Sequence, residues 1–368
     1  MRGLYIHIPF CRSKCIYCDF ASFAGKNDLQ DKYIEKLCAE AQRHRGLAFD
    51  TVYIGGGTPT VLSEDNFKKL FAAIHSAFDI MPHSEITVEA NPATVTAEKA
   101  RLLKSLGANR ISLGAQSFVD GELKTIGRIH SAADTADTVR LLRSEGFDNI
   151  SLDLMYSLPG QTEDTLMQSI ESMLALSPEH ISCYGLKVEE GTKLADMVAR
   201  GKLTEKSEDE FADMYAKICA VLTQNGYEHY EISNFAKTGF ESKHNCKYWR
   251  CEEYLGLGLG ASSYMNGVRF ANAPRFEDYF DGYKMEESER LSENDMMSEF
   301  VILGLRMLKS GVDTAEFEER FHRSAESVFG KIIDKNINAG LLSLTDGKLR
   351  LTERAYCICN SVMCEFIL

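Results

Sequence analysis

The feature that most constrains the fold is an alternation of β-rich segments with amphipathic helical segments in the first half of the chain. The segments expected to be strands are residues 4–8, 51–54, 85–89, 110–113, 150–154 and 180–184. Between the first two, Leu29, Tyr33, Leu37 and Ala41 are four residues apart and mark one face of a helix over 27–45. This order predicts βαβ units and a parallel sheet with right-handed crossovers. Six repeats are too few for a closed eight-stranded barrel. We therefore expect an α/β fold built on an open, partial (β/α)6 barrel rather than a flat doubly wound sheet.

The second half of the chain follows a different pattern. Residues 207–225 are expected to form a helix and residues 227–235 an aromatic strand. The glycine-rich segment 256–267 is expected to be a series of loops, and the charged segment 276–292 a loop-like boundary. Three helical patterns follow, then a hairpin with its turn at Asp346-Gly347 and a last helix from Thr352. Helices followed by a hairpin resemble a winged helix. We therefore expect a barrel with its extension in 1–275 and a small winged-helix-like domain in 285–368.

Composition bounds the partners and the compartment. The chain of 368 residues has 41 Lys+Arg against 54 Asp+Glu, a formal net charge of −13, which disfavours nucleic acid as a partner. Residues 295–368 hold nine basic and eleven acidic side chains, so DNA binding by the winged-helix-like domain is disfavoured too. The uncharged run 254–268 is shorter than the roughly 20 apolar residues of a spanning helix. With no signal peptide and eleven mostly isolated cysteines, we expect reduced thiols and a cytoplasmic location.

Three cysteines stand together directly after the first expected strand. Cys11, Cys15 and Cys18 are spaced C-x3-C-x2-C, so three soft thiolates fall within eight residues. Such a loop can hold an iron–sulfur cluster. A structural zinc would need a fourth ligand from a distant segment, and three buried thiols without a metal are the other alternative. A four-iron cluster held by three cysteines would leave one iron open to an external ligand.

The residues from Tyr5 to Cys18, YIHIPFCRSKCIYC, resemble the cluster motif of the radical S-adenosylmethionine (SAM) superfamily. The resemblance covers nearly the whole chain. It points to the branch that contains oxygen-independent coproporphyrinogen III oxidase and the related haem chaperone family HemW. It implies that Cys11, Cys15 and Cys18 ligate a [4Fe-4S] cluster. The open iron would then chelate the amino and carboxylate groups of SAM.

The resemblance also implies a set of SAM contacts at the carboxyl ends of the expected strands, where parallel folds place their sites. Taken singly, each of these residues would be interpreted as a solvated polar group, a cap or a tight turn. The glycines after the second strand allow close backbone approach to a ligand. Arg128 is expected to pair with the methionine carboxylate, and Glu89, Gln116 and Asp153 to hydrogen-bond the amino group and the ribose. The complete implied set is Tyr5, Tyr17, Gly56, Gly57, Thr58, Glu89, Gln116, Arg128 and Asp153.

Two features separate the chaperone from the oxidase. The oxidase motif has a fourth cysteine two positions after the third, whereas here Cys18 is followed by Asp-Phe, as in the chaperone. The segment HNCKYW, residues 244–249, resembles the chaperone's HNxxYW haem-binding motif, and this implies His244, Asn245, Tyr248 and Trp249 as haem contacts. A neutral histidine is a good axial iron ligand, and tyrosine and tryptophan offer flat apolar faces. The nearby thiols of Cys246 and Cys251 remain alternative ligands.

The resemblance therefore predicts a haem chaperone that binds haem and transfers it to acceptor haemoproteins such as respiratory enzymes, with relatives that can form homodimers. The alternative is oxygen-independent coproporphyrinogen III oxidase, a radical SAM enzyme of haem biosynthesis. Whether the chain turns over a substrate is left open by its sequence. A winged-helix regulator is the third alternative and would need a basic helix face that the sequence does not provide.

Overall fold

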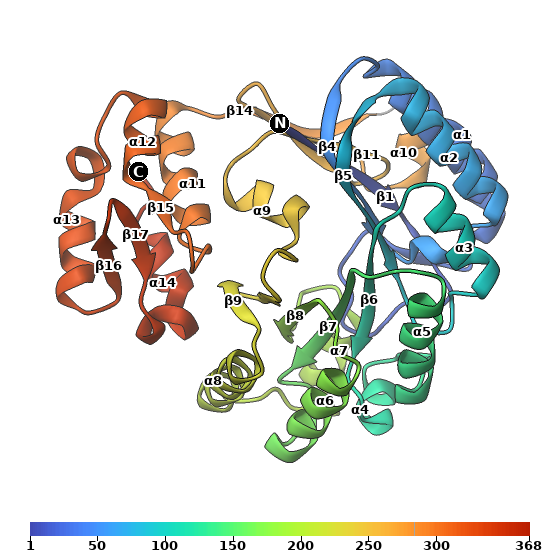
Figure 1. Cartoon of the computed structure of the whole chain (residues 1–368), viewed down its shortest axis with the longest axis horizontal. Helices are drawn as coiled ribbons and strands as arrows, with labels where there is room; N and C mark the ends of the chain where they lie inside the picture. The colour runs from blue at the N-terminus through green and yellow to red at the C-terminus, as the bar shows by residue number, and fades with distance from the viewer. Residues whose placement is uncertain (283) are drawn as a thin grey trace.

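The computed structural model describes residues 1–282 and 284–368 and has a mixed α/β architecture (Figure 1). A twelve-stranded sheet runs in the order β14-β13-β12-β11-β1-β4-β5-β6-β7-β8-β10-β9. Six of its central strands are parallel, as the alternation predicts: β1 (Arg2–Ile8), β4 (Ala48–Gly56), β5 (Asp79–Ala90), β6 (Arg110–Gln116), β7 (Ile150–Tyr156) and β8 (His180–Gly185). In the described part of the chain the sheet stays open between β14 and β9. The expected partial barrel is confirmed.

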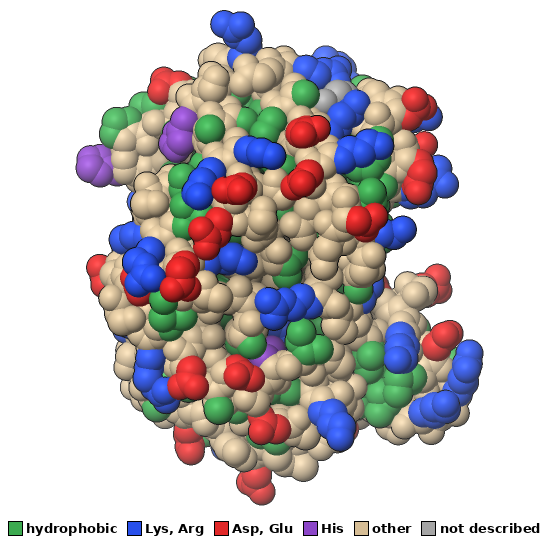
Figure 2. Space-filling model, turned by 90° about the vertical axis from the view of Figure 1, so that its right-hand side faces the viewer, with side chains coloured by type: hydrophobic (Ala, Val, Ile, Leu, Met, Phe, Trp, Pro, Cys, Tyr) green, Lys and Arg blue, Asp and Glu red, His purple; other side chains and the backbone are tan. Residues whose placement is uncertain are grey.

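Helices cover the outer face of this sheet (Figure 1). They are α1 (Gln30–Arg43), α2 (Glu64–Ala77), α3 (Ala97–Ser105), α4 (Asp120–Thr125), α5 (Ala132–Ser144) and α6 (Glu163–Ala175). Side-chain caps begin α2, α3, α5 and α6, as in the capping box in which Ser131 and Asp134 bond each other's backbone N–H groups. Figure 2 looks onto the side of the molecule that carries these helices, and acidic and basic side chains are interspersed there.

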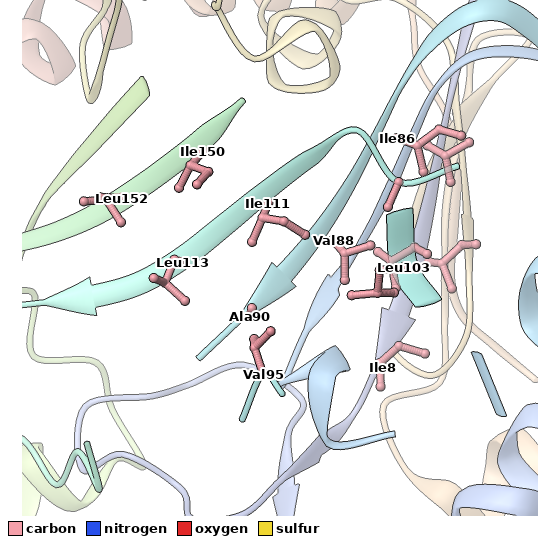
Figure 3. Packing of buried hydrophobic residues seen from close by; sticks show 14 of the residues in the cluster. Ile8, Ile86, Val88, Ala90, Val95, Leu103, Ile111, Leu113, Ile150 and Leu152 are labelled. Atoms are coloured by element: carbon pink, nitrogen blue, oxygen red, sulfur yellow. The ribbon is translucent and has the colours of Figure 1, made fainter. Parts of the chain in front are cut away.

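Side-chain alternation along the strands gives the sheet its two faces. Figure 3 shows one set of buried apolar residues, with Val88 of β5 beside Leu103 of α3 and with Ile111 and Leu113 following along β6. The residues between them in sequence point to the other face, into the barrel. Glu89 and Arg110 belong to that second set, and both line an interior cavity. The same alternation that builds the core therefore delivers polar side chains to the inside.

The sheet continues beyond the six predicted strands in a segment that we expected to be loops. The strand β11 (Tyr254–Leu257) runs parallel to β1, and β12 (Ser262–Met265), β13 (Val268–Asn272) and β14 (Met285–Arg290) follow antiparallel, with α10 (Phe276–Phe280) between the last two. The loop prediction for 256–267 and 276–292 was wrong. Glycine here serves close packing of strands, since a Cβ at Gly256 would collide with the backbone carbonyl of Ser262.

On the other edge of the sheet, β8 pairs antiparallel with β10 (Asn234–Ala236), which pairs with β9 (Glu228–Glu231). Two helices, α7 (Lys193–Ala199) and α8 (Glu208–Gln224), connect β8 to these strands. The short helix α9 (Lys243–Trp249) then packs against β1 and β4, and its Asn245 lines the cavity inside the barrel. Its first turn is fixed by Glu85 of β5, whose carboxylate accepts the backbone N–H groups of Lys243 and His244. The helix α9 therefore closes the floor of the barrel.

A second apolar core organises the C-terminal residues. It packs α11 (Glu293–Gly304), α12 (Thr314–Phe321), α13 (Ala325–Asn338) and α14 (Cys359–Cys364) around a sheet of β15 (Val312–Asp313), β17 (Lys348–Leu351) and β16 (Leu342–Thr345). This is the arrangement of helices and hairpin that the sequence predicts. The division into 1–275 and 285–368 stays a prediction, and β14 at 285–290 belongs to the large sheet. Among the described helices, none combines the length and apolar character that a membrane crossing requires.

Candidate functional site

A cavity of about 500 Å³ occupies the barrel interior and extends from the cysteine loop down to α9. Most of its strand residues lie in the carboxyl-terminal halves of the parallel strands, where βα folds gather their functional groups, and Arg110 and Ser112 line it from the first half of β6. The inward-pointing strand residues and the cysteine loop form its wall together. Among the lining residues are Cys11, Cys15, Tyr17, Cys18, Tyr53, Gly56, Gly57, Thr58, Glu89, Asn91, Arg110, Gln116, Arg128, Asp153, Ser182, Gly185 and Leu186.

The three cysteines present unpaired thiols to this cavity. The two ends of the cysteine loop are held together by a short parallel strand pair, β2 (Phe10–Cys11) with β3 (Phe23–Ala24). Thr58 Oγ1 donates to Cys11 Sγ at 3.6 Å, and Arg128 Nη1 lies 3.6 Å from Cys15 Sγ. Burial raises the pKa of the Cys11 thiol, and hydrogen bonds from neighbouring hydroxyls oppose that rise.

The donor set fits an iron–sulfur cluster. Soft thiolates are its usual ligands, and the hydroxyl and guanidinium neighbours of Cys11 and Cys15 stabilise negative charge on sulfur. In the described residues no three His, Cys, Asp or Glu side chains converge on a single ion. A cluster makes no such demand, because each thiolate serves a different iron. The three thiols can therefore ligate a cluster without the tight convergence that one metal ion requires.

Glycines after β4 let the cavity wall approach the cysteine loop. A Cβ at Gly57 would lie 2.7 Å from the Phe10 carbonyl oxygen and 3.1 Å from Cys11 Sγ. Gly56 has a φ of +108°, which side-chain-bearing residues rarely adopt, and its N–H donates to Glu89 Oε2 at 3.0 Å. These two glycines therefore allow tight packing between the end of β4 and the cysteine loop, and their approach to a ligand stays a prediction.

Two carboxylates and the cation of Arg110 line the middle of the cavity. Burial raises the pKa of Glu89 to about 7, even though Tyr53 donates to it at 2.8 Å, and burial raises the pKa of Asp153 to about 6. Arg110 is 1% exposed, and its Nε and Nη1 have no hydrogen-bond partner among the described residues. Its positive charge lowers the pKa of both carboxyl groups and so favours their ionised forms.

A second polar group surrounds Arg128. Its Nη2 donates to Asn91 Oδ1 at 2.7 Å, and Asn91 Nδ2 in turn donates to Thr58 Oγ1 at 2.8 Å. Gln116 reaches the cavity through an irregular register between β6 and β7 and has a φ of +67°. Bulges of this kind re-aim side chains next to functional sites. The hydrogen bond to Asn91 holds the guanidinium of Arg128 beside the cysteine loop.

The structure brings together eight of the nine predicted SAM contacts, and Tyr5 is the exception. The Tyr5 side chain faces a different cavity, and its hydroxyl is 3.0 Å from His7 Nδ1. Sequence reasoning missed Tyr53, Asn91 and Arg110. The period-two alternation of β4 and β6 places Tyr53 and Arg110 on the inner face, so that signal could have found these two.

The predicted haem residues do not form one cluster. His244 is 1% exposed, and its ring nitrogens are both occupied, by Thr51 Oγ1 at 2.8 Å and Tyr248 Oη at 2.8 Å. Burial, with the nearby charge of Lys247, lowers the pKa of His244 to about 3, which keeps the ring neutral. Asn245 lines the first cavity. Tyr248 and Trp249 instead line a second cavity, of about 480 Å³.

Comparison with known proteins agrees with this architecture. The sequence model of the Radical SAM superfamily matches residues 5–173, and that of the HemN C-terminal domain matches residues 291–358. Heme chaperone HemW of Lactococcus lactis is 41% identical over 99% of this chain and 97% of its own length. Heme chaperone HemW of Escherichia coli is 31% identical, with 99% and 98% covered. The solved structure of coproporphyrinogen III oxidase (HemN) from Escherichia coli, a radical SAM enzyme, superposes with a TM-score of 0.87 at 21% identity, covering 99% of this chain and 89% of that one.

A partial (β/α)6 barrel with three cysteines over a carboxylate-lined cavity defines a radical SAM protein. Membership of that superfamily implies a [4Fe-4S] cluster and SAM. Within the superfamily, the chain belongs to the HemW family.

Proposed function

We propose that this chain is a haem chaperone, which binds haem and transfers it to acceptor haemoproteins such as respiratory enzymes. The observation that carries the proposal is full-length identity of 41% and 37% with the proteins named heme chaperone HemW of Lactococcus lactis and Bacillus subtilis. The Asp-Phe pair after Cys18, in place of a further cysteine, agrees with it. The likeness to coproporphyrinogen III oxidase is one of fold, at 21% identity.

In this proposal the first cavity holds the cluster and SAM. Cys11, Cys15 and Cys18 ligate the cluster, which when bound supplies redox chemistry and an open iron site. Arg128 pairs with the carboxylate of SAM, and Glu89 accepts a hydrogen bond from its amino group. Gln116 and Asp153 hydrogen-bond the amino group and the ribose of SAM. The set is completed by residues of the same cavity: Gly56, Gly57 and Thr58 beside the amino group, and Tyr17 on the cysteine loop.

Glu89 and Asp153 accept hydrogen bonds from SAM in their ionised forms. At neutral pH Asp153 is mostly ionised and Glu89 only about half, given pKa values of about 6 and about 7. A cationic ligand favours the ionised form further, because an opposite charge lowers the pKa of a neighbouring carboxyl. Met155 and Leu186 supply apolar surface to the same cavity and exclude water from it.

We further propose that the protein works in the cytoplasm and forms a homodimer. All eleven cysteines are free thiols, and a reducing compartment keeps thiols in that state. Light scattering of the cluster-loaded protein with and without haem measures the oligomeric state. A stable dimer with haem only would indicate that cargo binding drives assembly.

The experiment that tests the function uses one anaerobically reconstituted sample for two assays. Haemin is titrated while the Soret band is recorded, and the haem-loaded protein is then mixed with an apo-haemoprotein. We expect saturable binding and transfer. The same sample with SAM, a reductant and coproporphyrinogen III should form no product beyond a single turnover. Product formation at catalytic rates, or the absence of haem binding, would overturn the proposal.

A further inference from the structure

A third cavity, of about 630 Å³, lies between the barrel and the C-terminal residues. One wall is formed by α7, by the connection that follows it and by the first turns of α8. The other wall is formed by η3 (Glu353–Ile358) and the start of α14. Cys357 Sγ of η3 lies 4.0 Å from the Ala212 carbonyl oxygen of α8, and Figure 1 shows α8 and α14 next to each other. Many of the lining residues are exposed, so this cavity is an open groove, the α8–α14 groove.

The interior of the α8–α14 groove is apolar. Both walls contribute apolar side chains to it: Val188, Leu194, Val198, Phe211 and Ile358. Phe211 is held against the barrel by Tyr156, with the two ring centroids 4.9 Å apart. Ile358 is 47% exposed, so its side chain gives up part of the free energy that burial would gain. An apolar surface laid into the groove would recover that free energy.

The rim of the groove is acidic. Glu205, Glu208 and Asp209 line it, and all three side chains are exposed. Burial and then the negative charge of Asp213 raise the pKa of the Cys357 thiol, so the carboxylate of Asp213 also lies near the groove. In the described part of the chain, none of these four carboxylates has a cation as an ion-pair partner.

The N-terminus of α8 explains only part of this charge. A helix N-terminus favours anions, but the effect fades within the first turn. Glu205 lies before the helix, and Asp213 lies beyond its first turn. Two lysines line the groove, Lys187 and Lys206, and Lys206 is already paired with Glu210 at 2.8 Å. The rim therefore keeps an unbalanced negative charge.

The spacing of these charges favours a protein segment over a small cation. Asp209 and Asp213 are four residues apart on α8, so they lie on one side of it, about 6 Å apart along the axis. A small cation does not reach carboxylates spread over this length and fill the apolar interior at the same time. An amphipathic helix does both, because its apolar face fills a groove while lysine or arginine side chains flank that face.

We propose that the α8–α14 groove binds a basic amphipathic helix of a partner protein, with the apolar face of that helix on Phe211 and Ile358 and its cations on the acidic rim. The inference does not depend on the proposed function. Leu186 and Lys187 line both this groove and the first cavity. A helix bound in the groove therefore contacts a segment that also borders the SAM site. Opposite charges on the two surfaces speed their encounter and make it sensitive to salt.

The test uses the full-length, cluster-loaded protein. The probe is a fluorescein-labelled peptide of about 15 residues, with leucine on one helical face and lysine on the other. Fluorescence anisotropy gives its dissociation constant. The triple variant Glu205→Gln/Glu208→Gln/Asp209→Asn removes three rim charges and keeps the capping box of α8 intact. Ile358→Asn removes apolar surface from the groove.

Each groove variant has a matched control elsewhere in the C-terminal residues. The triple variant Glu316→Gln/Glu318→Gln/Glu319→Gln removes three exposed carboxylates from α12. Leu344→Asn changes a side chain of β16 that is also 47% exposed. Urea unfolding verifies that all four variants are folded before their affinities are compared.

We expect the lysine peptide to bind the wild type and both controls with the same affinity. Both groove variants should bind it at least fivefold more weakly. Raising the salt concentration from about 50 to about 300 mM should weaken binding to the wild type by at least fivefold, because screening reduces the attraction between charges. A peptide with glutamate in place of lysine should not bind.

Three results would overturn the proposal. The first is no saturable binding of the lysine peptide to the wild type. The second is an unchanged affinity in both groove variants, and the third is an equal loss in the α12 control, which would indicate attraction between charges without a site. If the peptide does not bind and light scattering shows a wild-type dimer that Ile358→Asn loses, the groove is instead an interface between two copies of the chain.

Discussion

The carboxyl group of Glu89 makes the ligand-free protein less stable than it could be, and this can be measured. Its pKa is raised from the ordinary 4.5 to about 7 by burial in the barrel. The folded state therefore holds the proton more tightly than the unfolded state. The stabilisation from this proton is fully present below pH 4.5 and is lost as the pH rises through about 7. Above pH 7 the folded protein holds an ionised, desolvated carboxylate that Tyr53, the Gly56 N–H and Arg110 compensate only in part.

The magnitude follows from the two pKa values. The interval between 4.5 and about 7 corresponds to about 3 kcal/mol at pH 8. Part of the Glu89 side chain faces the cavity and keeps some hydration, so we expect about 2 kcal/mol to be recovered by Glu89→Gln. The amide imitates the protonated acid. Its oxygen accepts from the Gly56 N–H, and its nitrogen donates to the Tyr53 hydroxyl, which rotates to accept.

The assay is urea unfolding of the cluster-loaded, SAM-free protein at pH 8 and pH 5. Glu89→Gln should be more stable than the wild type by about 2 kcal/mol at pH 8 and by under about 1 kcal/mol at pH 5. SAM affinity should fall tenfold to a hundredfold, as expected for the loss of a charged hydrogen bond. The control Glu171→Gln, at an exposed position on α6, should leave stability and its pH dependence unchanged. A Glu89→Gln variant that is no more stable at pH 8 would refute this reasoning.

Three further outcomes are expected. Gly57→Ala places a Cβ against the Phe10 carbonyl, so iron bound on reconstitution should fall by more than half, whereas Gly121→Ala, with open space around it, should keep full iron content. Arg110→Met removes the cation that lowers the pKa of the cavity carboxyls, so calorimetry should show about tenfold weaker SAM binding at pH 7, largely restored at pH 9; an equal loss at both values would count against this role. Phe317→Ala empties a buried ring site in the C-terminal core and should cost about 3–5 kcal/mol in urea unfolding with SAM affinity retained; a cost below about 1 kcal/mol would contradict the packing.

Much of the barrel could be predicted because hydrophobic periodicity is a local signal. The six strands alternate with helices whose apolar residues recur at helical spacing. Once a strand is predicted, the residues directly after it are placed at its carboxyl end. The cysteine loop needs no long-range information, since Cys11, Cys15 and Cys18 are neighbours in sequence. The β11–β14 extension was missed for the opposite reason: its short strands pair across glycine-rich turns, and glycine is read locally as a loop signal.

The site residues that escaped prediction depend on packing between distant segments. The alternation of β6 places Arg110 on the inner face, but the sequence does not show that the barrel interior leaves it 1% exposed. The HNxxYW segment predicts four residues of one site, but a helix distributes neighbouring positions around its axis. His244 and Asn245 therefore face different surroundings although they are adjacent in sequence. The spacing of residues in a motif therefore does not tell which cavity each side chain of the helix faces.

The position of α9 has a consequence for how variants of this chain are interpreted. The helix spans seven residues, and its side chains enter both cavities while Glu85 and Thr51 hold its first turn. Because this one helix contributes side chains to both cavities, a small rotation of it changes the shape of the first cavity and of the second cavity together. A lost haem signal after substitution at His244 can thus report a tilted helix instead of a missing ligand. Measuring SAM affinity in the same variant separates the two, since a tilted helix disturbs both compartments.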